Sequence, residues 1–538
     1  MKVRALGQYG ILRDYEPYDL PLNAWSAGNN VAFAEGKVKR APGIRSIDDP
    51  TPTDPSFLMS VTQPDGAAFL VYPDNDGSLY KWIGGTETDV TPAGFVSGAS
   101  TEPFTGCVLS GVAYINRSTD VPYGYRSTDS DFVVIPAWDV NHKAKVIRKY
   151  KDFLIALNVT KSGVEYPRLF KTSHLALNNA FPDSFDHTNL TKLTYETEVT
   201  QINGPIIDGM ELRQSFVVYG NTQCAMVNFT GGSTIYDIKP LFQDGGAGVI
   251  NANCVVEVNG QHYVFGSNDI YTHDGVQKKS IVAGRNQRYI FDNIDKSKAH
   301  RCFVFHNTRT HTVHFCYVSV DEDAAFPGTT GCNRSAVYAY LEDTWSFSDL
   351  PSVNGVAEVN VAQVLTWATV TGSYSDAGST YALIDATKLD ATVMVCQQET
   401  ALGLTTSKIA AFDGLDKDSL IPYGIYTAAN PEAYIERTGL DLEELGDGDL
   451  AAYKLINRLL PQAKVFRDDV SVTFKTGSQM FPDGPLTWSA DKNFTSRSQY
   501  KVDVRKGGRY LAIHARMPTA NDFEWSGYDA DAGSLSRR

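Results

Sequence analysis

The sequence predicts a mainly β protein: a β-propeller-like array of antiparallel hairpin blades plus a C-terminal antiparallel β-sheet or sandwich, with few short helices. Three observations predict this fold. Tyr and Phe, which favour pleated and half-buried surfaces, number 28 and 26 among 538 residues. Gly (44) and Pro (24) supply many turns. A short apolar run, a turn and an aliphatic–Tyr–x–aromatic run recur along the chain.

The clearest of these repeats covers residues 69–82. An apolar run at 69–72 meets a turn at 74–77, where Asn75 and Gly77 tolerate positive φ, and residues 79–82 form the return strand. Further copies lie at 263–273 and 336–351, with weaker relatives at 111–118 and 215–223. Recurrence at intervals of tens of residues favours propeller blades, although unrelated hairpins in a generic β protein remain the alternative.

The length of the chain exceeds what one core can organise, so we expect several regions. They are an N-terminal strand and hairpin entry (1–50), a propeller-like body (51–354), an insertion or distal tip region with loops (355–450) and a C-terminal β unit that closes the body (451–538). In the last region, period-2 alternation at 470–474, 500–504 and 510–515 predicts three strands.

Helical signals are few. Residues 288–300 place Ile290, Phe291 and Ile294 on one face with charges on the other, which predicts a helix. Residues 430–437 place Pro431 in a first turn after an Asn cap, which predicts a second. The Gly-broken acidic run 441–449 is expected to be a solvated loop.

The formal net charge of −14 and the pI of about 5.2 argue against tight non-specific binding to DNA or anionic membranes, because like charges repel. The cysteines lack CxxC spacing, which favours reduced, buried thiols in a protein made in a cytosol: Cys107, Cys224, Cys254, Cys302, Cys316, Cys332 and Cys396. We expect no signal peptide and no membrane-spanning segment.

The chain has no GxSxG elbow, GxxxxGK[ST] loop or HExxH helix, so we assign no catalytic residue and no cofactor. His311, His314 and Cys316 come nearest to a metal cluster, but strand alternation would turn His311 and His314 to opposite faces, which favours ordinary strand residues. Asp74 and Asp76 resemble part of a calcium loop, and a hairpin turn explains them better.

Two further segments receive structural interpretations. An acidic cluster could gather a divalent ion, although such runs are more often simply solvated: Glu443, Glu444, Asp447 and Asp449. Residues 373–381 resemble the Asp-box turn of sialidase-type propellers through Asp376 and Gly378, with Tyr374 where Ser or Thr is expected. The Asp-box turn has a structural role even in those enzymes. Because the acidic cluster is best explained as a solvated run, we assign no metal site.

The most specific segment is N-terminal, where a Leu-Pro-x-x-Ala-Trp-Ser turn leads to Asn-Val-x-Phe, a Gly turn and a basic strand end. It resembles the opening of the tail nozzle proteins of short-tailed bacteriophages, the tail tubular protein B or packaged-DNA-stabilisation tail hub family. Later segments resemble a blade strand and the closing strands of that family. The residues that carry the resemblance are Leu20, Pro21, Ala24, Trp25, Ser26, Asn30, Val31, Phe33, Gly36, Arg40, Gly43, Trp345, Gly508, Arg509, Tyr510 and Trp525.

The resemblance implies a structural virion protein in the phage tail, made in the cytoplasm of the host bacterium. Such proteins form a homo-oligomeric ring, usually of six copies, below the portal and a tail adaptor. The ring encloses the channel through which the genome is retained and ejected. Tail fibres or spikes and a channel plug are further partners of such a ring. The resemblance also implies a strand at 454–462, where the spacing alone would permit a helix, and it is weak over 355–450.

An acidic channel would let DNA slide without sticking, because carboxylates repel phosphates. Two other functions remain open for the sequence. Exposed aromatic side chains at blade tips would instead suit a carbohydrate-binding or fibre-docking propeller, since such rings stack on sugars. A glycan-cleaving propeller enzyme is the third possibility, and it would require two carboxylates at a controlled separation.

Overall fold

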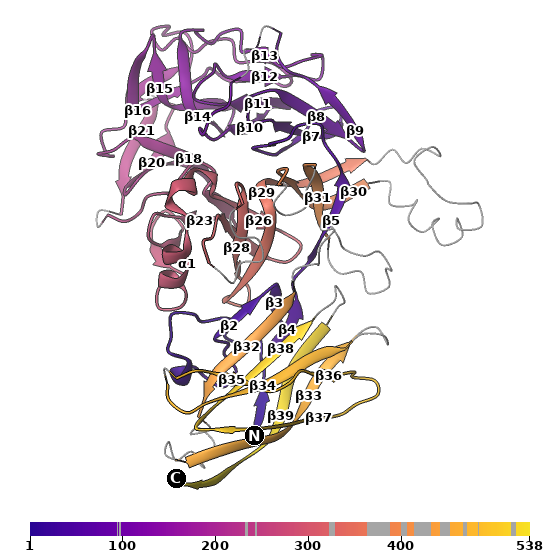
Figure 1. The fold of residues 1–538 in the computed structure, drawn as a ribbon. Helices are drawn as coiled ribbons and strands as arrows, with labels where there is room; N and C mark the ends of the chain where they lie inside the picture. Colours follow the sequence, from indigo (N-terminus) through magenta and orange to yellow (C-terminus); the bar gives the residue numbers. More distant parts are fainter. Residues whose placement is uncertain are drawn as a thin grey trace, which may run out of the picture.

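The computed structural model describes residues 1–537 apart from 94, 96–97, 232–234, 243–244, 322–328, 363–387, 400–405, 414–431, 442–451, 466–470, 483 and 518–522. Strands make up 54% of it and helices 4%, which confirms the mainly β prediction. A ring of small sheets, the propeller (residues 43–413), lies at one end of the molecule (Figure 1). A β-sandwich built from both ends of the chain (residues 1–40 and 433–537) lies at the other.

Five sheets of the propeller are blades of four antiparallel strands paired in sequence order. Blades one to five are β6–β9 (Met59–Thr62, Ala68–Pro73, Leu79–Ile83, Thr86–Asp89), β10–β13 (Thr105–Leu109, Val112–Asn116, Tyr123–Tyr125, Val133–Val134), β14–β17 (His142–Tyr150, Phe153–Lys161, Val164–Thr172, Tyr195–Glu198), β18–β21 (Ile206–Leu212, Ser215–Gly220, Cys224–Phe229, Tyr236–Leu241) and β22–β25 (Val255–Val258, Gln261–Phe265, Ile270–His273, Lys278–Ser280).

The remaining propeller sheet has seven strands, and the 19-residue strand β29 divides it. Up to Val353, β29 (Thr344–Ala362) pairs with β28 (Cys332–Ala339). Beyond Val353 it pairs with β30 (Lys388–Cys396), and both ladders change register there. We therefore count two blades that share one long strand. The order of the sheet is β26 (Phe303–Asn307), β27 (Thr312–Tyr317), β28 (Cys332–Ala339), β29 (Thr344–Ala362), β30 (Lys388–Cys396), β31 (Lys408–Asp413) and β5 (Gly43–Asp48).

The ring is closed by a strand from near the N-terminus. β5 pairs antiparallel with β31, so residues 43–48 supply the last strand of blade seven. The second half of β29 then contacts β6 and β7 of blade one. The described strands thus form a closed propeller of seven blades.

The sandwich has two sheets, each joining N-terminal to C-terminal strands. In the first sheet β1 (Lys2–Arg4) adds to β39 (Phe523–Arg537), and in the second β36 (Lys492–Phe494) adds to β34 (Val472–Gln479). The first sheet runs β3 (Val31–Ala34), β4 (Lys37–Arg40), β39 (Phe523–Arg537), β33 (Ala452–Val465) and β37 (Val502–Gly508). The second runs β2 (Ala27–Asn29), β32 (Ala433–Leu440), β38 (Tyr510–Met517), β34 (Val472–Gln479) and β35 (Thr487–Trp488).

The hairpin predictions are confirmed. Residues 69–82 form β7 and β8, residues 263–273 form β23 and β24, and residues 336–351 begin the β28–β29 pair. The strand that the family resemblance implied at 454–462 is also present, within β33. Of the three alternating C-terminal segments, residues 472–474, 502–504 and 510–515 are in strands, but the strands fall in two sheets: β37 in the first and β34 and β38 in the second.

The prediction of a helix over 430–437 is wrong. Its described part is the strand β32, whose side chains alternate between buried and half-buried positions. Pairing with β2 on one side and β38 on the other satisfies its backbone, and that tertiary pairing overrides the local cap signal. The helix predicted at 288–300 is present as two short pieces, α1 (Gln287–Asn293) and the 3₁₀ turn η2 (Lys296–Arg301); η1 (Pro17–Asp19) is a third short turn.

The described parts of 355–450 belong to both bodies. β30 and β31 complete blade seven, and β32 is a central strand of the sandwich. The Asp-box-like segment 373–381 and the acidic cluster 443–449 lie outside the described residues.

Candidate functional site

The residues of the N-terminal motif gather where the sandwich meets the propeller. Trp25 is 2% exposed, and its indole Nε1 donates to the carbonyl of Leu6 over 2.7 Å. Its ring lies 5.4 Å, centroid to centroid, from the ring of Trp525 in β39. The structure therefore brings together the two tryptophans that the family resemblance selected at opposite ends of the chain.

Asn30 links the two bodies directly. It has a φ of +54°, a conformation that Asn tolerates better than most residues. Its side chain donates to the Asp349 carboxylate in blade six over 2.9 Å and to the carbonyl of Glu432 over 3.1 Å. The Asp349 amide donates back to Asn30 Oδ1 over 2.9 Å. The neighbouring Asn29 also donates to Asp349, so a buried carboxylate is held by two amides of the motif.

A buried arginine that sequence reasoning missed fastens the Leu-Pro turn. Arg437 of β32 is 2% exposed and donates to the carbonyls of Pro17 and Leu20. Ser26 adds to this anchor, because its amide and hydroxyl both donate to the carbonyl of Glu436 over 3.1 Å. Arg437 thus holds the motif turn against β32 by donating to main-chain carbonyls of the turn. Every residue has such a carbonyl, so no side-chain pattern in the sequence pointed to Arg437.

The blade-six motif residue, Trp345, lies under the N-terminal loop. Its indole donates to the carbonyl of Ile281 over 2.9 Å, and its own carbonyl accepts from the amide of Ile11. Gly10 has a φ of +68°, and a Cβ there would lie 2.8 Å from the Trp345 carbonyl oxygen. The loop therefore approaches the blade more closely than a side chain would allow.

The other motif residues serve local structure. Pro21 and Ala24 close a turn, and Gly36 turns the β3–β4 hairpin so that Phe33 pairs with Val38. Burial lowers the pKa of Arg40 to about 10. The remaining positions are Leu20, Val31 and Tyr510, which are buried; Gly43, which begins β5; Gly508, where a Cβ would lie 2.8 Å from the Cβ of Ser478; and Arg509, whose amide donates to Gln479.

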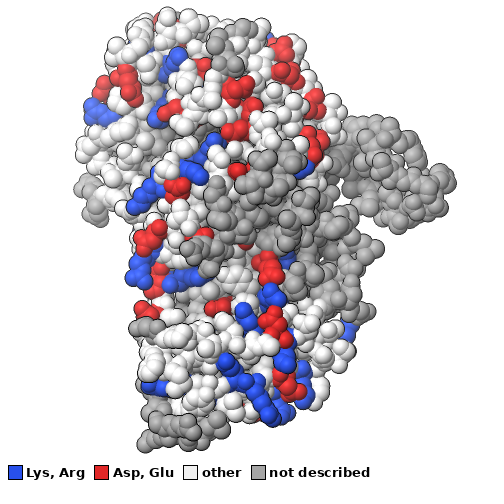
Figure 2. All heavy atoms as spheres, in the orientation of Figure 1, with Lys and Arg blue, Asp and Glu red and all other residues white. Residues whose placement is uncertain are grey.

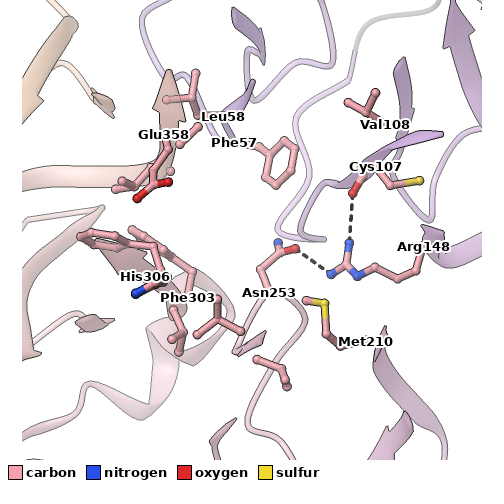
Figure 3. Close-up of a pocket in the computed structure, with 18 of the residues that line it drawn as sticks. Phe57, Leu58, Cys107, Val108, Arg148, Met210, Asn253, Phe303, His306 and Glu358 are labelled. Carbon is pink, nitrogen blue, oxygen red and sulfur yellow. Dashed lines mark hydrogen bonds between the residues drawn. The ribbon is translucent and has the colours of Figure 1, made fainter. Parts of the chain in front are cut away.

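A second feature, the axial cavity, lies at the centre of the propeller (Figure 3). Its volume is about 470 Å³, and all seven blades line it through their innermost strands or the segment just before β6. Phe57, Met210 and Val256 are partly exposed to it. A smaller, polar cavity of about 30 Å³ shares Asn253, Phe303 and Asn354 with it, so these residues separate the two.

A buried ion pair forms part of the cavity wall. Arg148 of β14 is 7% exposed and donates to both carboxylate oxygens of Asp208 in β18, over 2.9 and 3.0 Å. Its guanidinium also donates to Asn253 Oδ1 over 2.8 Å, and Asn253 Nδ2 donates to the carbonyl of Phe104. This network joins blades two to five. Sequence reasoning missed it, although a charge inside an apolar strand is a signal for such pairs.

The residues considered above as possible metal ligands have the hydrogen bonds and packing contacts of ordinary strand and turn residues. His314 is buried and stacks on Phe305 with ring centroids 4.4 Å apart, and burial lowers its pKa to about 3. His311 lies in the turn before β27 with a φ of +55°. Asp74 accepts from the amides of Asp54 and Asn75, as a turn carboxylate does. Among the described residues, no cluster of three His, Cys, Asp or Glu side chains has the arrangement of a metal site.

No described helix has the length and apolar character needed to cross a membrane. All seven cysteines are free thiols, six of them buried.

Comparisons with known proteins add little to this description. No protein-family model matches the chain, and no curated protein sequence matches it. Among solved structures, the computationally designed Ika8 protein is similar at 9% identity, with a TM-score of 0.38, over 75% of this chain and 99% of that one. BBS1N, solved in complex with ARL6DN, gives 11% identity and a TM-score of 0.38 over 69% and 97%. PorZ of Porphyromonas gingivalis, a component of the type-IX secretion system, gives 7% and 0.34 over 73% and 43%. Similarity at this level carries no argument about function.

Proposed function

We propose that this chain is a structural subunit of a phage tail nozzle, a ring below the portal and adaptor that encloses the channel for genome retention and ejection. In this role the protein positions other components and performs no catalysis. The proposal is carried by one observation: the motif residues from both ends of the chain pack together. Trp25, Trp525, Asn30 and Trp345 all lie in the sandwich or at its contact with blade six.

The distribution of charge supports the proposal. Residues 41–430, which contain the propeller, have 27 basic and 42 acidic residues, a net charge of −15. The rest of the chain, which contains the sandwich, has 21 basic and 20 acidic residues. One face of the molecule shows acidic side chains spread over the propeller (Figure 2). A ring that turned its propellers toward DNA would therefore repel phosphates and let the genome slide.

The propeller axis itself is a poor conduit. Its two cavities are small and are separated by Asn253, Phe303 and Asn354. The genome channel would therefore have to lie between copies of the chain, which requires a closed ring.

The carbohydrate-binding alternative finds little support. In the described part of the propeller every Tyr, Phe and Trp side chain is buried or half-buried. The exposed aromatic residues among the described residues all belong to the sandwich or the N-terminal loop. They are Tyr9, Tyr15, Tyr18, Phe481 and Tyr500. Sugar stacking at blade tips would need aromatic rings that solvent can reach.

The test is the state of assembly. Light scattering and native mass spectrometry of the full chain, alone and mixed with the portal and adaptor proteins of the same genome, should give a closed ring of several copies. Negative-stain images of the mixture should place that ring below the adaptor. A chain that stays monomeric in both samples and binds glycans on an array would contradict the proposal.

A further inference from the structure

The axial cavity has the character of a ligand site. Its volume of about 470 Å³ falls within the range of roughly 300–1,000 Å³ found for small-molecule pockets. Phe57 from the segment before β6, Met210 from β18 and Val256 from β22 are partly exposed there, so blades one, four and five each contribute apolar surface. Water against such a wall gains few hydrogen bonds.

The buried cation of the cavity wall is already paired. The Arg148 guanidinium donates to both carboxylate oxygens of Asp208. It also donates to Asn253 Oδ1, a contact drawn in Figure 3. An anionic ligand would therefore lose its hydration without gaining Arg148 as a charged partner.

Acidic groups outnumber basic groups among the remaining charged residues of the lining. Glu211, Glu358 and Lys149 are the three, and the Glu358 carboxylate accepts from the amide of Thr308 over 2.8 Å. The net charge of −15 over residues 41–430 adds a field of the same sign. Both effects oppose the entry of an anion.

We propose that the axial cavity binds a small organic molecule with an apolar body that is neutral or carries one positive charge, and that it excludes the anionic form of the same body. The apolar surface supplies the affinity, because displacing water from it is favourable. The carboxylates of Glu211 and Glu358 set the preference for charge. This site is independent of ring assembly, because every residue that lines it belongs to one chain.

The experiment uses three probes that share one body: 4-phenylbutylamine, 4-phenylbutanol and 4-phenylbutyrate. Their binding to the full chain is measured by isothermal titration calorimetry and by the rise in melting temperature, since a ligand that binds only the folded state stabilises it. We expect saturable binding of the amine and the alcohol, and at least tenfold weaker binding of the carboxylate.

Two variants fill the cavity from different blades: Met210→Trp and Val256→Phe. Either is expected to weaken binding of the amine at least tenfold with an unchanged circular dichroism spectrum. The matched control is Met480→Trp, which places the same side chain at a position of the sandwich that is 46% exposed, and should bind as the wild type does.

Several results would overturn the proposal. They are a lack of saturable binding by all three probes, equal binding of the carboxylate, and wild-type affinity in both cavity variants. If the cavity variants instead abolished self-association in light scattering, the occupant would be a side chain of a second copy, and the small-molecule assignment would be wrong.

Discussion

Asn30 and Asp349 hold each other by reciprocal hydrogen bonds, the Asn30 amide to the Asp349 carboxylate and the Asp349 backbone amide to Asn30 Oδ1, both over 2.9 Å. Asn30 belongs to the turn between β2 and β3 of the sandwich, and Asp349 to β29 of the propeller. Because both side chains are buried, the pair makes the stability of each body depend on the other.

We expect Asn30→Ala to destabilise the protein by about 3 kcal/mol. The change leaves the Asp349 carboxylate short of a donor and places Ala at a φ of +54°. Urea unfolding followed by tryptophan fluorescence checks this. Asn259→Ala is the matched control, because Asn259 has a φ of +53° and is exposed, so only the backbone cost of about 1 kcal/mol should remain. Equal losses of unfolding free energy in the two variants would contradict a stabilising role of the Asn30–Asp349 hydrogen bonds.

We expect Arg148 and Asp208 to be strongly coupled in their contributions to the free energy of unfolding. Arg148→Met alone should cost about 3–5 kcal/mol, because it leaves the wholly buried Asp208 carboxylate without its charged partner. The double variant Arg148→Met/Asp208→Leu should recover a large part of that loss. A double-mutant cycle on unfolding free energies measures the coupling; additive losses would contradict a direct interaction.

A buried chain of hydrogen bonds fixes the tautomers of two histidines. The amide of Gly275 donates to His273 Nδ1 over 3.3 Å, so His273 Nε2 carries the proton and donates to the Tyr219 hydroxyl over 2.5 Å. Tyr219 donates to His262 Nδ1 over 2.6 Å, and His262 Nε2 donates to the carbonyl of Glu211. Both rings are neutral in this arrangement.

Burial lowers the pKa of His262 to about 4 and that of His273 to about 3. The unfolded chain binds these protons near pH 6.5, so stability is full above pH 6.5 and is lost as the pH falls toward 4. We expect a loss of about 2 kcal/mol per histidine between pH 7 and pH 5. The double variant His262→Gln/His273→Gln should reduce this slope in urea unfolding by the share of these two rings, while buried His314 and His514 keep theirs. His187→Gln, at a side chain that is 46% exposed, should leave the slope unchanged.

The thiols provide a fourth prediction. Burial raises the pKa of Cys107 to about 12 and that of Cys302 to about 12, and six of the seven cysteines are inaccessible to solvent. We expect native protein to release at most one equivalent of thionitrobenzoate from Ellman's reagent, and unfolded protein to release seven. Cys107→Ala should abolish the native signal. Rapid reaction of several thiols at neutral pH would show that the blades open readily.

Local features of the fold could be predicted from the sequence because local chemistry determines them. The hairpin at residues 69–82 follows from apolar runs on either side of a turn with Asn75 and Gly77. The β3–β4 hairpin likewise follows from Gly36, which has a φ of +69°. These elements need no information from distant parts of the chain.

Long-range pairing could not be predicted in the same way. Nothing in residues 43–48 indicates that they pair with β31, and nothing in β32 indicates that β2 and β38 lie on either side of it. The same limit applies to the candidate site. The sequence selected Trp25 and Trp525 through a family pattern, but their contact and the partnership of Asn30 with Asp349 arise only in three dimensions.

The way β5 closes the ring has a consequence for synthesis on the ribosome. The propeller is complete once β31 has emerged, while β3 and β4 still lack β39, the strand beside them in the finished sheet. During that interval Val31 and Phe33, both buried in the finished protein, can contact β29 of the propeller but lack the C-terminal strands of the sandwich. The nascent chain therefore exposes the unpaired edge of β4 until β39 has been made. A premature stop codon between β31 and β39 would yield a folded propeller with an aggregation-prone N-terminal hairpin.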